Sequence, residues 1–201
     1  MRREQFLRSL RSRVADERVL AAVAAVPREL FVAPALRRFA YLDRPLPIGG
    51  GQTISQPTLV ARMCERLELS DDDVVLDVGT GSGYHAALLS RLCHHVYGVE
   101  LDPELAAQAI RSLALAGIEN VTVVVGDGAA GLPERAPFDA INVAATASGE
   151  VPVVLENQLA VGGRLIAPVA RDDGEHLVLV RRSAEGIERT LLDAVRFVPL
   201  R

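Results

Sequence analysis

The chain has 201 residues, of which 49% are hydrophobic, and a formal net charge of −4 at pH 7. This length and composition predict one soluble globular domain with a sizeable core. The negative charge argues against binding nucleic acid through bulk charge, and no apolar run reaches the roughly 18 residues of a membrane span. All 22 basic residues are arginine, which excludes a Schiff-base lysine, a P-loop lysine and a lysine general base.

Neither the start of the chain nor its thiols and imidazoles indicate export or metal binding. Residues 1–7 lack the long apolar core of a signal peptide, so we expect a cytoplasmic location. Cys64 and Cys93 lie among apolar residues of predicted helices and are interpreted as buried, reduced thiols. His94 and His95 have no other ligands at a recognisable spacing, so no metal site is predicted.

The first part of the chain predicts a helical cap. An amphipathic helix is expected over residues 4–13, and Asp16 is a candidate N-cap for a second helix over 17–25. Pro27 interrupts this helix, and a further helical segment over 28–32 continues toward the next proline. We expect these helices to close one side of the core.

Residues 43–57 predict an irregular segment with a functional role. The segment holds three prolines and three consecutive glycines, which make it too broken for a helix or a central strand. It is also too apolar for a solvated linker, and long irregular segments in compact domains are usually functional or disordered. Thr53 and Ser55 can donate hydrogen bonds from it, with Gln52 and Gln56 beside them.

Strands and helices alternate after residue 57. Helices are expected over residues 58–67, 84–89, 103–116 and 151–159, and strands over 74–78, 95–100, 120–125, 138–144 and 164–169. Two final strands, 175–182 and 187–195, flank a turn and predict an antiparallel hairpin. The fold class is therefore α/β: a doubly wound, mostly parallel, Rossmann-like sheet with helices on both faces, an N-terminal helical cap and a C-terminal antiparallel hairpin.

A glycine-rich turn follows the first strand of this core. Gly79, Gly81 and Gly83 form a G-x-G-x-G pattern between the strand and the next helix, as in a nucleotide-binding βαβ unit. Tyr84 occupies the position where the dinucleotide fingerprint has its last glycine, so the pattern suits S-adenosylmethionine better than NAD. By itself the turn is equally compatible with an ordinary α/β connection.

Two acidic residues, at the ends of the second and third predicted strands, make the prediction of a cofactor site more specific. Ligands of open parallel sheets bind beyond the carboxyl ends of the strands. Glu100 ends the second strand and can accept both hydroxyl hydrogens of a ribose, and Asp127 ends the third and can accept from an adenine amino group. The predicted cofactor-binding residues are Asp77, Gly79, Thr80, Gly81, Ser82, Glu100, Leu101, Asp127 and Gly128.

From about residue 19 onward the chain carries further motifs outside the cofactor turn. They are Val26–Val32 (VPRELFV), Leu46–Pro57 (LPIGGGQTISQP), Ala136–Ile141 (APFDAI), Gly162–Leu165 (GGRL) and Val195–Leu200 (VRFVPL). With these motifs the chain resembles the protein-L-isoaspartate O-methyltransferase family of class I S-adenosylmethionine-dependent methyltransferases. We therefore expect a single methyltransferase domain over 1–201, with a helical cap and substrate loop at 1–57 and a cofactor-binding core at 58–201.

The resemblance implies a reaction and a substrate site. The implied reaction is methyl transfer from S-adenosyl-L-methionine to the α-carboxylate of L-isoaspartyl residues in damaged proteins or peptides, which starts repair through a succinimide and releases S-adenosyl-L-homocysteine. It implies that Ser55 is the active-site residue and that Gln52, Thr53 and Ile54 bind substrate. The acceptor carboxylate, with a reference pKa of about 3.9, needs no general base. Capping of the helix at 58–67 is the alternative role for Ser55.

Some residues depart from the family pattern and leave alternatives open. Asp77 stands where glutamate is more usual, His85 stands where glutamine is frequent, and 144–150 lacks the usual proline. One alternative is a relative that methylates aspartate in a dedicated natural-product peptide, and another is a non-catalytic S-adenosylmethionine-binding protein. The loop motif and the negative charge disfavour a small-molecule or RNA methyltransferase. We expect isoaspartyl proteins or peptides as partners, no nucleic acid, no membrane, and a monomer.

Overall fold

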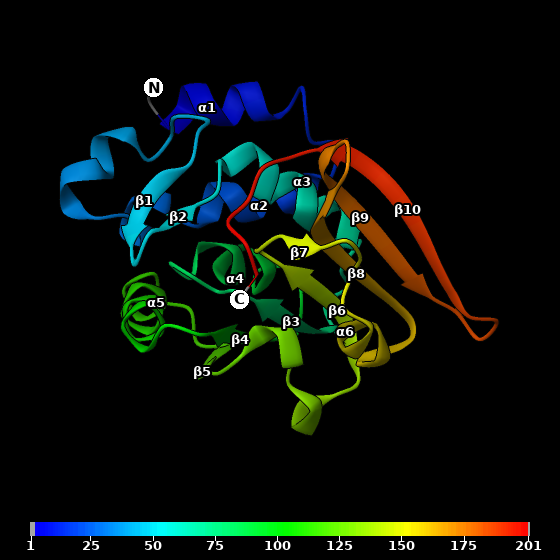
Figure 1. Ribbon diagram of the computed structural model, residues 1–201. Helices are drawn as coiled ribbons and strands as arrows, with labels where there is room; N and C mark the ends of the chain where they lie inside the picture. Colours follow the sequence, from blue (N-terminus) through cyan, green and yellow to red (C-terminus); the bar gives the residue numbers. More distant parts are fainter. Residues whose placement is uncertain (1–2, 201) are drawn as a thin grey trace.

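The computed structural model describes residues 3–200; residues 1–2 and 201 of the predicted domain lie outside the described residues. Its main sheet has the strand order β10-β9-β8-β6-β3-β4-β5, and β7 pairs with the end of β8 (Figure 1). The pairs among β3, β4, β5, β6 and β8 are parallel, whereas β9 and β10 are antiparallel. The strands are β3 Val74–Val78, β4 His95–Glu100, β5 Val121–Val125, β6 Phe138–Val143, β7 Ala147–Ser148, β8 Leu159–Arg171, β9 Gly174–Arg182 and β10 Ile187–Ala194.

Helices cover both faces of the sheet, as the sequence predicts. Successive side chains of β3 point to opposite faces, so Val75 joins one apolar cluster and Leu76 joins the other. The first cluster includes residues of α2, α3, α4 and α5, and the second includes Leu155 of α6. The helices are α1 Arg3–Leu10, α2 Glu17–Ala25, α3 Pro57–Leu67, α4 Tyr84–Leu89, α5 Pro103–Leu115 and α6 Val153–Asn157. Within residues 3–200, none of these helices has the length and apolar character needed to cross a membrane.

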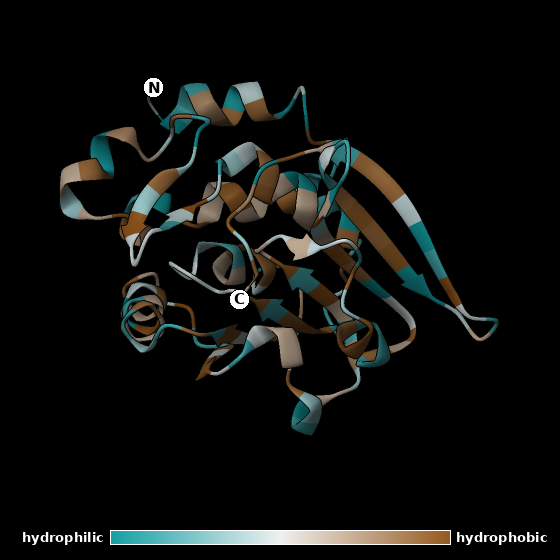
Figure 2. Ribbon diagram, viewed as in Figure 1, coloured by the Kyte–Doolittle hydropathy of each residue, from teal (hydrophilic) through white to brown (hydrophobic). Residues whose placement is uncertain are grey.

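Hydropathy follows this layering. In Figure 2, β8 and β9 are mostly brown, whereas the edge strand β10 mixes brown and teal residues. The burial of the strands agrees, because β9 buries a run of four central residues and β10 buries none. A strand at the edge of a sheet has one face and one side open to water, which explains the polar residues of β10.

The N-terminal cap forms with one correction. The Asp16 side chain accepts from the backbone N–H groups of Arg18 and Val19, so it caps α2 as predicted. After Pro27 the chain forms two short 3₁₀ turns, Arg28–Phe31 and Pro34–Phe39, where a further helical segment over 28–32 is predicted. Pro27 precedes the first turn and Pro34 begins the second; neither residue has a backbone N–H to continue the preceding helical segment, which favours short turns over a continuous α-helix.

The prediction of an irregular segment over 43–57 is partly wrong. The segment contains an antiparallel hairpin of β1 (Leu46–Gly49) and β2 (Gln52–Ile54). Gly49, Gly50 and Gly51 make the reversal with φ angles of 104°, 57° and 72°, which side chains with a Cβ rarely adopt. Because the hairpin belongs to no larger sheet, it tolerates Pro47, which a central strand would not.

The last parallel strand is longer than predicted. β8 starts at Leu159 and not at Arg164, and the helix before it is correspondingly short. Gly162 and Gly163 lie inside the strand, where its register with β6 shifts between Phe138 and Ala140. A bulge of this kind interrupts the alternation of side chains along the strand. The sequence around Gly162 and Gly163 therefore resembles that of a turn.

Arg164 of β8 ties the end of α3 to the start of β3. Its guanidinium donates to the carbonyl oxygens of Leu67 at 2.7 Å and Glu68 at 2.6 Å, which are among the carbonyls that a helix end leaves unpaired. It also forms an ion pair with Asp73 at 2.8 Å, with both side chains mostly buried. Burial raises the pKa of Asp73, but hydrogen bonds from Ser70 and Arg164 outweigh it and lower that pKa.

Replacing Arg164→Ala should lower the free energy of unfolding by about 2 to 4 kcal/mol, because the substitution leaves a largely buried carboxylate without its ion-pair partner and two helix carbonyls without their donor. Urea denaturation followed by circular dichroism measures this change. Arg171→Ala, at the exposed end of the same strand, is the matched control and should change stability by less than about 0.5 kcal/mol. Equal effects of the two substitutions would contradict the role given to Arg164.

Candidate active site

A cleft opens at the carboxyl ends of β3 and β4, beside the point where the strand order reverses between β3 and β6. Such switch points are where open α/β sheets bind ligands. The cleft holds about 840 Å³ of empty space, including the part open to solvent. Its lining comes from the whole length of the chain: Ile48, Gln52–Ser55, Val60, Gly79–Ser82, Tyr84, His85, Val99–Leu101, Gly128, Ala144, Ala145 and Val198–Leu200.

The glycine turn forms the floor of this cleft. Gly79, Gly81 and Gly83 have φ angles of 78°, 54° and 85°, a region that favours glycine. The turn is held to β4 because the N–H of Gly79 donates to the Val99 carbonyl at 2.9 Å. A Cβ on Gly81 would lie 3.3 Å from Cδ1 of Ile48, so the β1–β2 hairpin lies directly over the turn.

Glu100 presents a fixed carboxylate at the wall of the cleft. Its Oε2 accepts from the N–H of Gly81 at 2.7 Å, and its Oε1 accepts from the N–H of Asp102 at 3.0 Å. The side chain is buried, and each oxygen retains capacity for a further hydrogen bond. The carboxylate is therefore preorganised to accept from hydroxyl groups of a ligand in the cleft.

Asp127 and Gly128 follow β5 and take different places. Asp127 is exposed and does not line the cleft; its Oδ1 accepts from the N–H of Ala129 at 2.9 Å and caps a short 3₁₀ turn. Gly128 does line the cleft, and a Cβ there would lie 2.6 Å from Cγ1 of Val78. The backbone at Gly128 therefore approaches β3 more closely than any residue with a side chain allows.

Asp77 lies beneath the cleft and does not line it. It is fully buried, and the amide nitrogen of Asn142 donates to its Oδ1 at 2.7 Å. The same nitrogen lies 3.1 Å from Nδ1 of His85, whose ring does line the cleft. Asp77 is thus connected to the cleft through Asn142 and His85. Two departures from the family pattern, Asp77 and His85, belong to one buried network.

The charges of this network follow from burial. Burial raises the pKa of Asp77 to about 6, against the hydrogen bond from Asn142. Burial also lowers the pKa of His85 to about 3, so the imidazole is neutral at pH 7. Because Nδ1 accepts from the amide of Asn142, the ring proton is assigned to Nε2.

Among residues 3–200, no group of three or more His, Cys, Asp or Glu side chains is arranged to hold a metal ion.

Arg28 holds the predicted substrate loop from below. It is fully buried, and it donates from Nη2 to the Ser55 carbonyl at 2.7 Å and from Nε to the Ala40 carbonyl at 2.8 Å. Its guanidinium carbon lies 4.6 Å from the centre of the Tyr84 ring, within the range of a cation–π interaction. One side chain therefore joins the cap, the Ser55 loop and the helix after the glycine turn.

Ser55 does not cap α3, so the alternative role for this residue is wrong. The N-cap position belongs to Gln56, which makes no side-chain capping bond, and the N–H of Thr58 donates to Oδ1 of Asp43 at 3.1 Å. Within the described part of the chain, the Ser55 hydroxyl has no hydrogen-bond partner. Ser55 lines the cleft together with the other predicted substrate residues, Gln52, Thr53 and Ile54.

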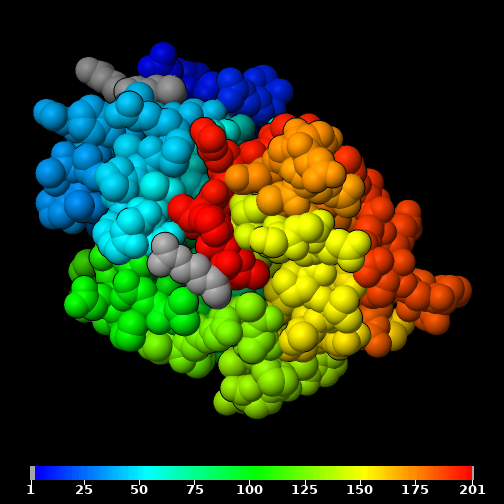
Figure 3. Space-filling model, viewed as in Figure 1, coloured from blue at the N-terminus to red at the C-terminus, as the bar shows by residue number. Residues whose placement is uncertain are grey.

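Sequence reasoning missed the wall made by the C-terminal segment. The N–H of Thr146 donates to the Val198 carbonyl at 2.7 Å, and the N–H of Leu200 donates to the Thr146 carbonyl at 2.8 Å. In Figure 3 the segment after β10 (red) lies between the β1–β2 hairpin (cyan) and the segment around β7 (yellow). The motif at 195–200 marks the segment, but pairing between residues so far apart leaves no local pattern.

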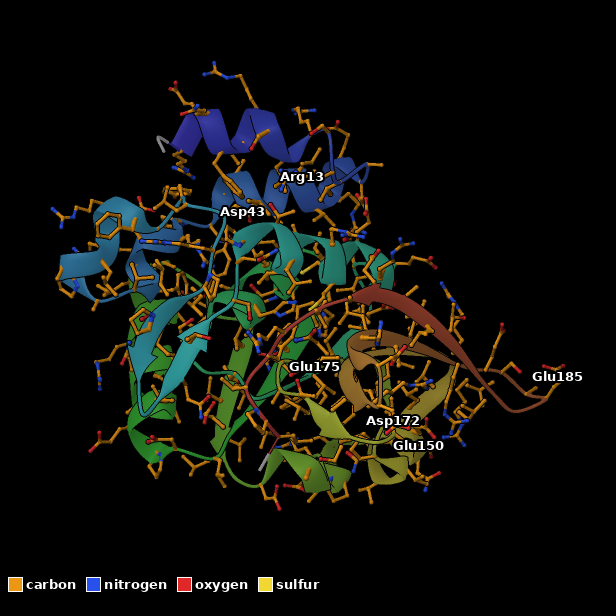
Figure 4. The ribbon with its side chains drawn as sticks, turned by 45° about the horizontal axis from the view of Figure 1, so that its top comes forward. Arg13, Asp43, Glu150, Asp172, Glu175 and Glu185 are labelled. Atoms are coloured by element: carbon orange, nitrogen blue, oxygen red, sulfur yellow. The ribbon has the colours of Figure 1, made fainter. Side chains whose placement is uncertain are left out.

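Glu175 fixes this wall from β9. Its Oε2 accepts from the Thr146 hydroxyl at 2.9 Å and from the N–H of Phe197 at 2.9 Å, and Figure 4 labels it on the strand beside the C-terminal segment. The Val195 N–H donates to the Glu175 carbonyl at 2.8 Å. The segment that departs from the family pattern at 144–150 is thus anchored to both β9 and the C-terminal segment.

Comparisons with known proteins agree with this arrangement. A protein-L-isoaspartate O-methyltransferase from Methanoculleus marisnigri is 52% identical over 187 residues, which cover 93% of this chain and 84% of that protein. One from Methanothrix thermoacetophila is 48% identical and covers 100% of this chain and 95% of its own. A Plasmodium falciparum protein assigned to the same activity, crystallised with S-adenosyl-L-homocysteine, superposes with a TM-score of 0.89 at 26% identity, covering 100% of this chain and 99% of that one.

The family comparison covers the cap, the substrate loop and the cofactor-binding core together. The model of protein-L-isoaspartate(D-aspartate) O-methyltransferase matches residues 1–201. Neither the cofactor turn alone nor the Rossmann-like core alone accounts for a match of this extent, since the motifs outside the turn lie in the cap, the loop and the C-terminal segment. The chain belongs to the protein-L-isoaspartate(D-aspartate) O-methyltransferase family.

Proposed function

We propose that this chain transfers a methyl group from S-adenosyl-L-methionine to the free α-carboxylate of L-isoaspartyl residues in damaged proteins or peptides. The methyl ester then favours closure to a succinimide, which starts repair. The observation that carries the proposal is that one cleft joins the Glu100 and glycine-turn wall to the Ser55 loop. The names of relatives at about half identity support it.

The residues of the cleft fit S-adenosylmethionine. The cleft lies at the carboxyl ends of β3 and β4, where open α/β sheets bind nucleotide-type ligands. Glu100 would accept from the ribose hydroxyls, and the turn at 79–82 with Leu101 and Gly128 would line the rest of the cofactor. When bound, the cofactor supplies a methyl group on a positively charged sulfur. Asp127 is proposed to reach the adenine amino group from the rim, and Asp77 to act from beneath through its buried network.

Ser55 is proposed to hold the acceptor. A side-chain or terminal carboxylate is already ionised at pH 7, so the protein has to align it and exclude water rather than remove a proton. The free Ser55 hydroxyl can donate to one carboxylate oxygen, and Gln52 and Thr53 offer further polar contacts beside it. Ile54 and the wall at 198–200 supply the apolar surface that keeps water from the reacting atoms.

The same proposal extends to organisation and location. We propose that residues 1–57 form the cap and substrate loop of one methyltransferase domain and that 58–201 form its cofactor-binding core. A monomer and a cytoplasmic location also stay predictions. The curated relatives carry the name of the repair enzyme, which favours general repair over a dedicated natural-product peptide or a non-catalytic role.

The test of the function compares two peptides that differ only in one linkage. The protein, supplied with radiolabelled S-adenosylmethionine, should methylate a peptide that contains an L-isoaspartyl residue and leave its aspartyl twin unlabelled. The reason is that the cleft has to align the acceptor carboxylate, and the two linkages place it differently relative to the backbone. Base-labile methyl incorporation measures transfer. Equal labelling of both peptides, or of neither, would overturn the repair function.

Two substitutions should separate acceptor alignment from cofactor binding. Ser55→Ala should lower kcat by about 10- to 100-fold and leave the Kd for S-adenosylhomocysteine within about twofold, since it removes one donor to a charged acceptor. Glu100→Gln should raise that Kd by about 10- to 100-fold, because an amide oxygen accepts less strongly than a carboxylate and the new N–H₂ opposes the N–H of Gly81. Isothermal titration calorimetry and steady-state rates measure the two effects. The reverse pattern would contradict both assignments.

Glu175→Ala should loosen the C-terminal wall. Without the carboxylate, the Thr146 hydroxyl and the Phe197 N–H lose their acceptor, so amides over 197–200 should exchange hydrogen faster. We expect kcat/KM for an isoaspartyl peptide to fall by about 10-fold through poorer alignment. Asp172→Ala, an exposed acid in the turn before the same strand (Figure 4), should change neither exchange nor rate. Unchanged exchange in the Glu175 variant would show that this residue does not hold the wall.

A further inference from the structure

A second and larger groove continues outward from the active-site cleft. It lies between α3 and the segment 193–198, which run beside one another (Figure 1), and it holds about 1900 Å³ of empty space counted to its open mouth. Thr53, Ser55, Ala144 and Val198 line both the groove and the cleft. A polypeptide whose reacting carboxylate reaches Ser55 therefore has a continuous path out of the cleft along this groove.

Arginines dominate the charged lining of the groove. Arg13, Arg62, Arg66 and Arg196 line it, against the carboxylates of Glu65 and Asp193. An excess of positive charge at this place contrasts with the chain as a whole, whose formal net charge is −4.

Two of these arginines are already paired. Arg13 forms an ion pair with Asp43 at 2.8 Å, seen at the upper part of Figure 4, and Arg62 pairs with Asp193. Their charges are largely compensated by these neighbours, so they contribute little to the selection of a ligand.

The remaining two arginines are free to meet a ligand. Arg66 and Arg196 are exposed, and within residues 3–200 neither forms an ion pair. The Glu65 carboxylate forms an ion pair with neither of them; its Oε1 accepts from the N–H groups of Ala15 and Asp16 at 2.6 and 2.9 Å. The groove thus has two unpaired positive charges on an otherwise acidic protein.

We propose that this groove carries the polypeptide that flanks the isoaspartyl residue and prefers flanks rich in Asp and Glu, with Arg66 and Arg196 as the residues that determine this preference. The inference rests on the proposed methyl transfer and names its substrate class. Apolar lining from Leu59 and Phe197 accommodates the backbone and aliphatic parts of the chain. Charge complementarity of this kind raises association rates and discriminates against like-charged partners.

Three isoaspartyl peptides of one length test the proposal. Their flanking residues on both sides are Asp and Glu, Asn and Gln, or Arg and Lys. We expect kcat/KM to fall in that order, with about a 10-fold difference between the acidic and basic peptides at low ionic strength. The difference should shrink toward unity at about 1 M salt, where the Debye length is only about 3 Å.

A charge-reversed variant and its matched control assign the preference to the groove. Arg66→Glu with Arg196→Glu should abolish or invert the order of the three peptides. Arg91→Glu with Arg111→Glu makes the same change in net charge at exposed sites outside the groove and should keep the original order. Thermal unfolding of both variants verifies that each is folded.

The outcomes separate this proposal from the proposed function. Equal rates for the three peptides, or the same order in both charge-reversed variants, would overturn the groove as the selecting site while transfer itself still supports isoaspartyl methylation. Absence of transfer to every isoaspartyl peptide would overturn the proposed function and, with it, this inference. A preference for basic flanks in the unsubstituted protein would overturn the charge assignment alone.

Discussion

A single buried guanidinium joins the parts of this protein that have to meet at the cleft. Arg28 is fully buried, and burial lowers its pKa. A buried cation is costly unless its donors are satisfied. The carbonyls of Ala40 and Ser55 accept from Nε and Nη2, and the ring of Tyr84 lies against the guanidinium, whereas Nη1 is buried without a hydrogen-bond partner among residues 3–200. These groups come from the cap, the loop and the helix after the glycine turn. If any of the three moved away, the buried guanidinium would lose one of its contacts.

The two sides of the cleft are built differently. The cofactor side is local, since the glycine turn, Glu100 and Gly128 lie at the carboxyl ends of strands that are next to one another in the sheet. The acceptor side is assembled from the β1–β2 hairpin and from the segment at 198–200.

Beneath the cofactor side of the cleft, the two residues that depart from the family pattern, Asp77 and His85, belong to one buried network. Asp77 and His85 both contact the amide of Asn142, and each would lack this partner if the network were broken. The carboxylate orients the amide, and the amide in turn fixes the tautomer of the imidazole that lines the cleft. The buried network therefore connects β3 and β6 to His85, which lines the cleft.

The C-terminal segment serves both the cleft and the groove. Val198 lines both of them, Phe197 lines the groove, and Leu200 lines the cleft. Glu175 holds this segment to Thr146 and to β9. In the function proposed here, selection of flanking residues in the groove and alignment of the acceptor at Ser55 would both depend on this one segment.

The sequence by itself determined what short-range patterns encode. Alternating strands and helices, the N-cap at Asp16, the glycine turn and the carboxylate at Glu100 were all predictable, because each depends on residues a few positions apart or on the shared edge of a parallel sheet. Only the tertiary structure decided the β1–β2 hairpin, the start of β8 at Leu159, the pairing of Thr146 with Val198 and the place of Asp77 below the cleft. These features depend on contacts between residues far apart in the chain, which leave no periodic signal in the sequence.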